Sequence, residues 1–175
     1  SGNNTVALKG SSSDTLTDNT TYSDCTITVT DEAGNVSSSI TLTEFTVDTT
    51  ASTLAEVTAV TTPTNDTTPN YSFSSSQTGT ITYGGSCSSD NSSAAASDNN
   101  TITLKGASTS TLAEGTYSDC TITVTDNASN TVTLNISSFV VDTTAPTLSS
   151  TSPADLDNLT SISTSISVEF SEEMD

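Results

Sequence analysis

The chain has no histidine and no tryptophan, and its 175 residues include two Lys or Arg against 21 Asp or Glu. Without histidine, the side chain most often used as a general base is missing, and Ser-His or Cys-His pairs cannot form. With so few cations the chain cannot displace counterions from phosphates, which excludes nucleic acid as a partner. A net charge of −19 also opposes contact with a bare anionic membrane surface. We therefore expect no enzymatic activity and no catalytic residue.

Long apolar runs are missing as well. None approaches the roughly 18 residues that a membrane span requires, so no membrane insertion is expected. The first residue is Ser, and no signal peptide is visible, which is typical of an internal or processed segment of a longer protein. Only 31% of the residues are hydrophobic, but they fall in short alternating runs among Thr residues that suit strands. This pattern predicts an ordered β structure with a thin core.

An internal repeat organises the chain. The string TYSDCTITVTD stands at residues 21–31 and again at 116–126, which places Cys25 and Cys120 95 positions apart. The flanking segments match too: NNTVALKG (3–10) with NNTITLKG (99–106), and FTVDTTAST (45–53) with FVVDTTAPT (139–147). A period near 95 residues is too long for a helical solenoid and predicts an array of independent domains. We expect the C-terminal part of one repeat at 1–52, a complete repeat at 53–146 and the N-terminal part of a third unit at 147–175.

The repeat also accounts for the odd number of cysteines. Cys87 and Cys120 are the only pair within the complete repeat, and we expect them to form a disulfide. Cys25 is the counterpart of Cys120, so its partner would lie outside the segment. A reactive lone thiol is the alternative, but there is no histidine or nearby base to activate it. A disulfide indicates an oxidising, extracytoplasmic compartment and would stabilise the unit by about 3–4 kcal/mol.

Alternating apolar and polar residues predict the strands of the complete repeat. The expected strands are 53–60, 70–75, 79–85, 100–106, 116–126 and 130–142, and the Ala-rich segment 92–100 is expected to be a loop. Such short strands with a cysteine pair between an early and a late strand predict an all-β fold, an antiparallel β-sandwich. Parity places Cys120, Ile122 and Val124 inside, and the same parity predicts inward positions for Cys25, Ile27 and Val29. Gly34 in the turn DEAGN (31–35) is available for a left-handed conformation.

These segments resemble bacterial immunoglobulin-like (Ig-like) repeat domains, which occur in tandem in large extracellular adhesins. The resemblance rests on GTYSDCTITVTDNASN (115–130), on the Ser/Thr-rich strands and on the junction VDTTAP (141–146), and it covers residues 1–147. Tyr117 is similar to the tyrosine-corner residue of that fold, although it stands three residues before Cys120 instead of two. The tail, 146–175, is similar to Ig-like domains of S-layer and surface proteins, with a Ser-Pro-Ala-Asp start and an F-S-E-x-M-D end. The resemblance implies tandem Ig-like sandwiches at the cell surface, with neighbouring Ig-like domains of the same or adjacent chains as partners.

Aspartates near the junctions are candidates for calcium, which prefers carboxylate, amide and carbonyl oxygens. Arrays that the chain resembles hold interdomain calcium with such residues. The candidate ligands are Asp31 and Asn35, Asp126 and Asn130, and the strand-end residues Asp48 and Asp142. We expect Asp142 and the loop from Asp126 to Asn130 to converge at one pole of the sandwich. The alternative is that these are turn residues, since Asp and Asn readily bond their own backbone.

Three functions remain open at this point. The first is a stalk or fibre segment of a long extracellular surface protein, a rigid spacer without catalysis. The second is an adhesion module that binds glycans or proteins, with an unknown ligand; the eight Tyr and Phe residues, most at core positions, give little support for it. The third is a small filament subunit whose partial domains are completed by neighbouring subunits. The acidic residues Glu172, Glu173 and Asp175 are expected to form a solvated strand end.

Overall fold

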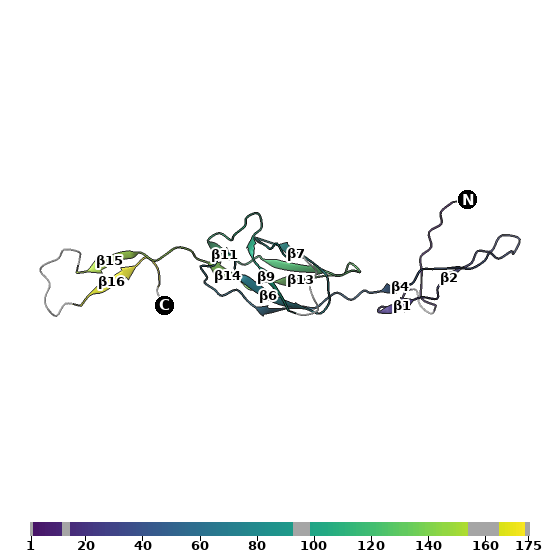
Figure 1. Ribbon diagram of the computed structural model, residues 1–175, viewed down its shortest axis with the longest axis horizontal. Helices are drawn as coiled ribbons and strands as arrows, with labels where there is room; N and C mark the ends of the chain where they lie inside the picture. Colours follow the sequence, from purple (N-terminus) through teal and green to yellow (C-terminus); the bar gives the residue numbers. More distant parts are fainter. Residues whose placement is uncertain (1, 12–14, 93–98, 154–164, 174–175) are drawn as a thin grey trace.

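The computed structural model describes residues 2–11, 15–92, 99–153 and 165–173, and these ranges form an all-β protein with antiparallel sheets and no helix. Figure 1 shows three groups of strands that follow one another along the long axis. None of the described segments is a helix long and apolar enough to cross a membrane. Parts of three predicted features lie outside the described residues: positions 93–98 of the Ala-rich loop, 154–155 of the tail start, and 174–175 of the tail end.

The central group of strands forms an antiparallel β-sandwich from β5 to β14. Its strands are β5 (Leu54–Thr58), β6 (Asn70–Ser75), β7 (Thr80–Gly84), β8 (Cys87–Ser88), β9 (Asn99–Thr103), β10 (Lys105–Gly106), β11 (Gly115–Tyr117), β12 (Thr121–Thr125), β13 (Thr131–Asn135) and β14 (Phe139–Val141). One sheet has the order β5-β6-β9 and another has the order β13-β12-β7, while β8 pairs with β10 and β11 with β14. All these pairings are antiparallel.

Alternation along the strands fills the space between the sheets. From β6, Tyr71 and Phe73 are fully buried, and β12 contributes Ile122 and Val124, which are also fully buried. The inward prediction for Cys120, Ile122 and Val124 is confirmed, with Cys120 2% exposed. The thin core predicted from composition is one cluster of 14 buried residues, all in the central unit.

The disulfide predicted between Cys87 and Cys120 is confirmed. Their Cα atoms lie 5.2 Å apart, inside the usual range for a disulfide, and both residues are buried. The bond joins β8 to the segment just before β12, so it connects an early part of the unit to a late one. Cys25 is a free cysteine, and its side chain is half-buried.

Three predicted strands are each divided in the structure, and one of them, 100–106, forms β9 and β10 in different sheets. The stretch 116–126 forms β11 and β12, which belong to different sheets, and 130–142 likewise forms β13 and β14. The break coincides with a close approach of the chain: a Cβ on Gly85 would lie 2.1 Å from the Asp119 carbonyl oxygen. With the Cys120 disulfide, this contact holds the segment between β11 and β12 against the β7–β8 turn, so the chain leaves one sheet there and enters another.

The first unit has little core. It contains β1 (Thr20–Tyr22), β2 (Thr26–Ile27), β3 (Ile40–Thr41) and β4 (Phe45–Val47), paired as β1–β4 and β2–β3. The prediction that Ile27 and Val29 face inward is wrong: they are 36% and 67% exposed. Their counterparts in the central unit share one core cluster with residues of β6 and β9, and among the described residues no equivalent strand packs over β2.

Hydroxyl pairs connect neighbouring strands on the outer faces. Thr123 on β12 and Thr133 on β13 lie 2.8 Å apart at their Oγ1 atoms, and Ser72 on β6 is 2.8 Å from Thr101 on β9. Neutral cross-strand pairs of this kind stabilise a sheet by a few tenths of a kcal/mol or more each. At the C-terminal end, β15 (Leu148–Ser152) and β16 (Ser167–Phe170) form an antiparallel hairpin.

Candidate functional site

The two copies of the junction sequence VDTT form the same local turn. After β4, the Thr50 backbone N–H donates to Asp48 Oδ1 at 3.0 Å. After β14, the Thr144 N–H donates to Asp142 Oδ1 at 3.0 Å. Asp is suited to this position because its short carboxylate reaches the backbone two residues ahead. Asp48 and Asp142 therefore act as turn residues in the structure, the alternative to calcium ligands.

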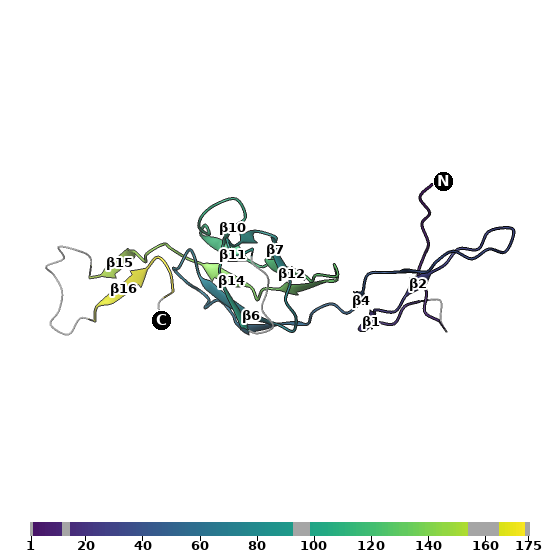
Figure 2. The same cartoon turned by 45° about the vertical axis from the view of Figure 1, so that its right-hand side comes forward.

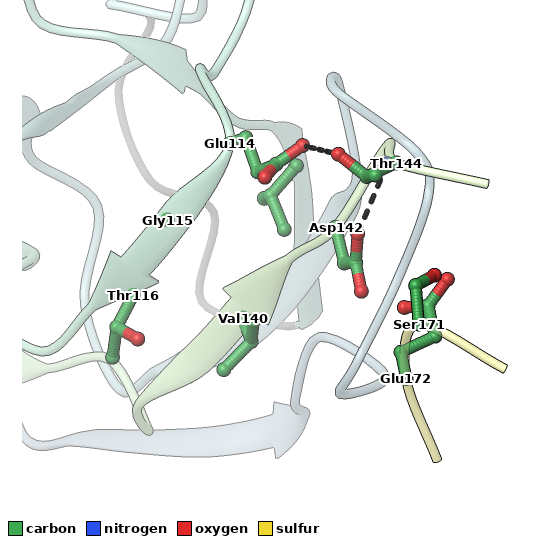
Figure 3. Close-up of a pocket in the computed structure, with 9 residues that line it drawn as sticks. Glu114, Gly115, Thr116, Val140, Asp142, Thr144, Ser171 and Glu172 are labelled. Atoms are coloured by element: carbon green, nitrogen blue, oxygen red, sulfur yellow. Dashed lines mark hydrogen bonds between the residues drawn. The ribbon is translucent and has the colours of Figure 1, made fainter. Parts of the chain in front are cut away.

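At each junction a second carboxylate, just before a neighbouring strand, accepts hydrogen bonds from the junction threonines. Asp18, just before β1, accepts the Thr49 N–H at 2.6 Å and the Thr50 hydroxyl at 2.7 Å. Glu114, just before β11, accepts the Thr144 hydroxyl at 2.7 Å (Figure 3). It also accepts the Thr143 hydroxyl at 3.1 Å.

These bonds favour the ionised carboxylates. Donation from the Thr50 hydroxyl lowers the pKa of Asp18, and donation from the Thr144 and Thr143 hydroxyls lowers the pKa of Glu114. Both residues are therefore charged acceptors near neutral pH. We call each arrangement of acid and junction threonines a junction clasp.

The predicted loop residues form one geometry twice. Asp126 accepts the N–H groups of Ala128 and Asn130 at 2.8 and 2.9 Å, and the Asn130 side-chain amide donates to its other oxygen at 2.9 Å. In the first unit Asp31 accepts the backbone N–H and the side-chain amide of Asn35, at 2.8 and 2.9 Å. The Asn side chains lower the pKa of both aspartates. Gly34 has a φ of +88°, which confirms its left-handed prediction, and Ser129 takes the same position with a φ of +73°.

One loop also reaches the preceding junction. The Asn130 side-chain amide donates to the Asp48 carbonyl oxygen at 3.1 Å, across 82 residues of sequence. The loop at the end of the β12–β13 hairpin therefore contacts the last strand end of the unit before it. Asn130 and Asp48, two of the candidate calcium ligands, are therefore in contact. The contact is a hydrogen bond from a side-chain amide to a backbone carbonyl and does not involve the Asp48 carboxylate.

The expected convergence of Asp142 with the loop from Asp126 to Asn130 is wrong. Residues 115–125 run from one end of the sandwich to the other through β11 and β12. Because β14 is antiparallel to β11, with Val141 opposite Gly115, Asp142 lies at the end where β11 begins. Asp126 follows β12, and the loop after it lies at the opposite end, where the Asn130 amide bonds to Asp48. Figure 2 shows β12 nearer than β14 to β4. Each junction therefore brings together a strand end from one unit and a loop or hairpin from the next.

A hollow of about 430 Å³ lies at the second junction, and three acids contribute to its lining (Figure 3). These are Glu114, Asp142 and Glu172. The Oε1 atom of Glu172 is buried and accepts no hydrogen bond from the described residues. Even so, within the described ranges no three Asp, Glu, Cys or His side chains gather closely enough to hold a metal ion. Calcium at the junctions stays a prediction.

Sequence reasoning missed Asp18 and Glu114. A signal was present, because each precedes a copy of the same TYSDC string. The offset differs, however: Asp18 stands three residues before Thr21, whereas Glu114 stands two before Thr116. The one-residue shift and the change from Asp to Glu conceal the correspondence, and the longer Glu side chain offers additional reach. Comparison of the chain with known protein families, curated proteins and solved structures found no match.

Proposed function

We propose that the chain is a spacer segment of a long extracellular surface protein, built from tandem Ig-like sandwiches that form a stiff rod. The observation that carries the proposal is the junction clasp, in which a carboxylate accepts hydrogen bonds from two junction threonines at each junction. A spacer transmits force and keeps its length, so its junctions must resist bending. Charged acceptors on junction hydroxyls supply that resistance, since hydrogen bonds to ionised groups are the stronger class.

Other features support a mechanical role. Pro146 restricts its own φ and the residue before it, which limits the conformations of the second junction. The disulfide supports an oxidising compartment and limits how far the central unit can extend before the bond breaks. The acidic surface keeps neighbouring copies apart in solution. The neighbours of each sandwich would be other Ig-like units.

The test is to remove one clasp and measure the dimensions of the chain. Glu114→Ala takes away the acceptor for both junction threonines, and we expect a broader distance distribution with a shorter mean length in small-angle X-ray scattering. Glu32→Ala is the matched control, because it removes the same charge from an exposed turn far from the second junction. Identical scattering from Glu114→Ala and the parent chain would refute a stiffening role for the clasp.

The two other functions stay predictions. Three of the five aromatic side chains of the central unit, those of Tyr71, Phe73 and Phe139, are buried and unavailable as a glycan-stacking surface, while Tyr83 and Tyr117 are partly buried. A glycan array probed with the full chain tests the adhesion module. Analytical ultracentrifugation across a range of concentrations tests the filament subunit.

A further inference from the structure

The first unit has an exposed apolar face, and the central unit shows which strands bury the corresponding face. This face, which we call the β2–β3 face, consists of Cys25, Ile27, Val29, Ile40 and Leu42. Ile27 and Ile40 are register partners, and the Leu42 N–H donates to the Cys25 carbonyl at 2.9 Å. Parity adds Val29 to the same side of the pair.

The corresponding residues of the central unit make the same contacts. Ile122 is the register partner of Leu134, and the Ile136 N–H donates to the Cys120 carbonyl at 3.0 Å. There, however, Ile122 is fully buried and Cys120 is bonded to Cys87. The backbone arrangement is therefore shared, and only the cover differs.

The cover in the central unit comes from one short stretch of chain. Strand β6 supplies Tyr71 and Phe73 to the core and pairs with β9, while β7 pairs along the edge of β12. Cys87 on β8 completes the disulfide. Residues 70–88 thus provide an edge strand, two core aromatics and one cysteine.

Each of these contributions is missing over the β2–β3 face. In the part of the chain that the structure describes, strand β2 pairs with β3 alone, whereas β12 has a neighbour on both edges. Residues 3–10, the counterpart of 99–106, form no strand, and Val6 and Leu8 are 62% and 40% exposed. Cys25 is a free cysteine at the position where Cys120 is bonded.

We propose that the β2–β3 face is a docking site for a polypeptide segment with the chemistry of residues 70–88. The segment adds one strand to the free edge of β2 and another to residues 3–10, and it places aromatic side chains over Ile27 and Val29. Its cysteine then forms a disulfide with Cys25. Main-chain bonds to an open edge and pockets for alternate side chains are the usual basis of strand addition.

The test uses the full chain and a synthetic peptide of residues 67–90, whose cysteine is supplied as a mixed disulfide with glutathione. The Cys25 thiolate attacks the peptide sulfur, the new disulfide forms, and glutathione leaves as a thiolate, so no other oxidant is needed. Docking raises the effective concentration of the peptide sulfur near Cys25. We expect capture about a hundredfold faster than for a peptide in which Tyr71, Phe73 and Ile81 are replaced by Ser.

Variants of the chain separate docking from simple thiol reactivity. Ile27→Ser should slow capture of the native peptide, and Cys25→Ser should abolish it. Val36→Ser is the matched control and should leave the rate unchanged. Val36 is 64% exposed but pairs with Thr30, whose side chain alternates away from Val29.

Equal capture rates for the native and Ser-substituted peptides would overturn the proposal, and so would preferential formation of a Cys25–Cys25 dimer of the chain. Neither result depends on the stiffness of the junctions, so this test and the scattering test fail independently.

Discussion

Two copies of one eleven-residue string have different environments in this molecule. In the central unit Ile122 and Val124 are fully buried, whereas Ile27 and Val29 in the first unit are 36% and 67% exposed. The letters are identical, so the difference comes from the strands that pack against them. Burial at these positions is a property of the partner strands, and the alternating pattern only makes the face available.

Other contacts are the same in both units. Tyr22 on β1 stacks on Phe45 of β4 with ring centroids 5.4 Å apart, and Tyr117 on β11 stacks on Phe139 of β14 at 5.2 Å. Both aromatic pairs are register partners in antiparallel strands. The late strand pair therefore adopts its structure with or without a covered core, because its own residues supply the contacts.

The largest expected effect comes from uncovering the central unit. Phe73→Ala removes a fully buried ring from β6 and should lower the free energy of unfolding by about 3–5 kcal/mol. Phe45→Ala is the matched control in the first unit, where the ring is only half-buried. Thermal unfolding followed by near-ultraviolet circular dichroism measures both. Equal losses would show that the two units do not differ in core.

Removing the disulfide should have the next largest effect. The double variant Cys87→Ala/Cys120→Ala frees a loop with a sequence separation of 33 residues, and we expect a loss of about 3–4 kcal/mol. Urea denaturation measures the loss. Cys25→Ala should leave the midpoint of the central unit unchanged, because Cys25 forms no disulfide in the described chain. A shift with Cys25→Ala would mean that the two units unfold together.

A smaller gain is expected where the two loops differ. Ser129 has a φ of +73° at the position that Gly34 occupies in the first unit. Ser129→Gly removes the left-handed strain and should stabilise the central unit by about 0.5–1 kcal/mol after the entropy cost of glycine. Differential scanning calorimetry detects a change of this size. Ser129→Ala keeps the strain, so an equal gain from that variant would contradict the argument.

The smallest expected effect is that of calcium. The Asp31 and Asp126 carboxylates already accept N–H donors on both oxygens, and we expect millimolar calcium to move the melting temperature of the full chain by less than about 4 °C, equivalent to under about 1 kcal/mol. Calorimetry in calcium and in EDTA checks this. A larger shift that disappears in Asp142→Asn would place an ion at the hollow beside Glu172.

Much of the fold was predictable from the sequence. The repeat and the positions of the cysteines led to the correct disulfide, and alternation located the strands of the central unit except β8. A single alternation running through Cys120 and Ile122 did not reveal that 116–126 changes sheets. Tyr117 packs against the core from β11, so the inward parity changes between the two halves, next to the contact with the distant Gly85. Alternation also could not predict that Ile27 is exposed, because the burial of a strand face depends on strands that are distant in the sequence.

The candidate site was predictable only in its parts. The junction and loop aspartates were identified by type and position, and they do form turns. Their grouping was wrong for Asp142 and Asp126, because the direction of β14 relative to β11 decides which ends meet. Glu114 was missed because its role depends on a side chain that reaches across to Thr143 and Thr144.

The hydroxyl pairs on the outer faces have a consequence for ionic strength. Thr123 with Thr133 and Ser72 with Thr101 are neutral contacts that dissolved ions do not weaken. The charges of the chain, at −19, mainly repel one another, and repulsion between exposed charges is screened beyond about 8 Å at physiological salt. High salt therefore weakens the repulsion between carboxylates while leaving the hydroxyl pairs intact. We expect this chain to gain stability at salt concentrations that destabilise proteins held together by ion pairs.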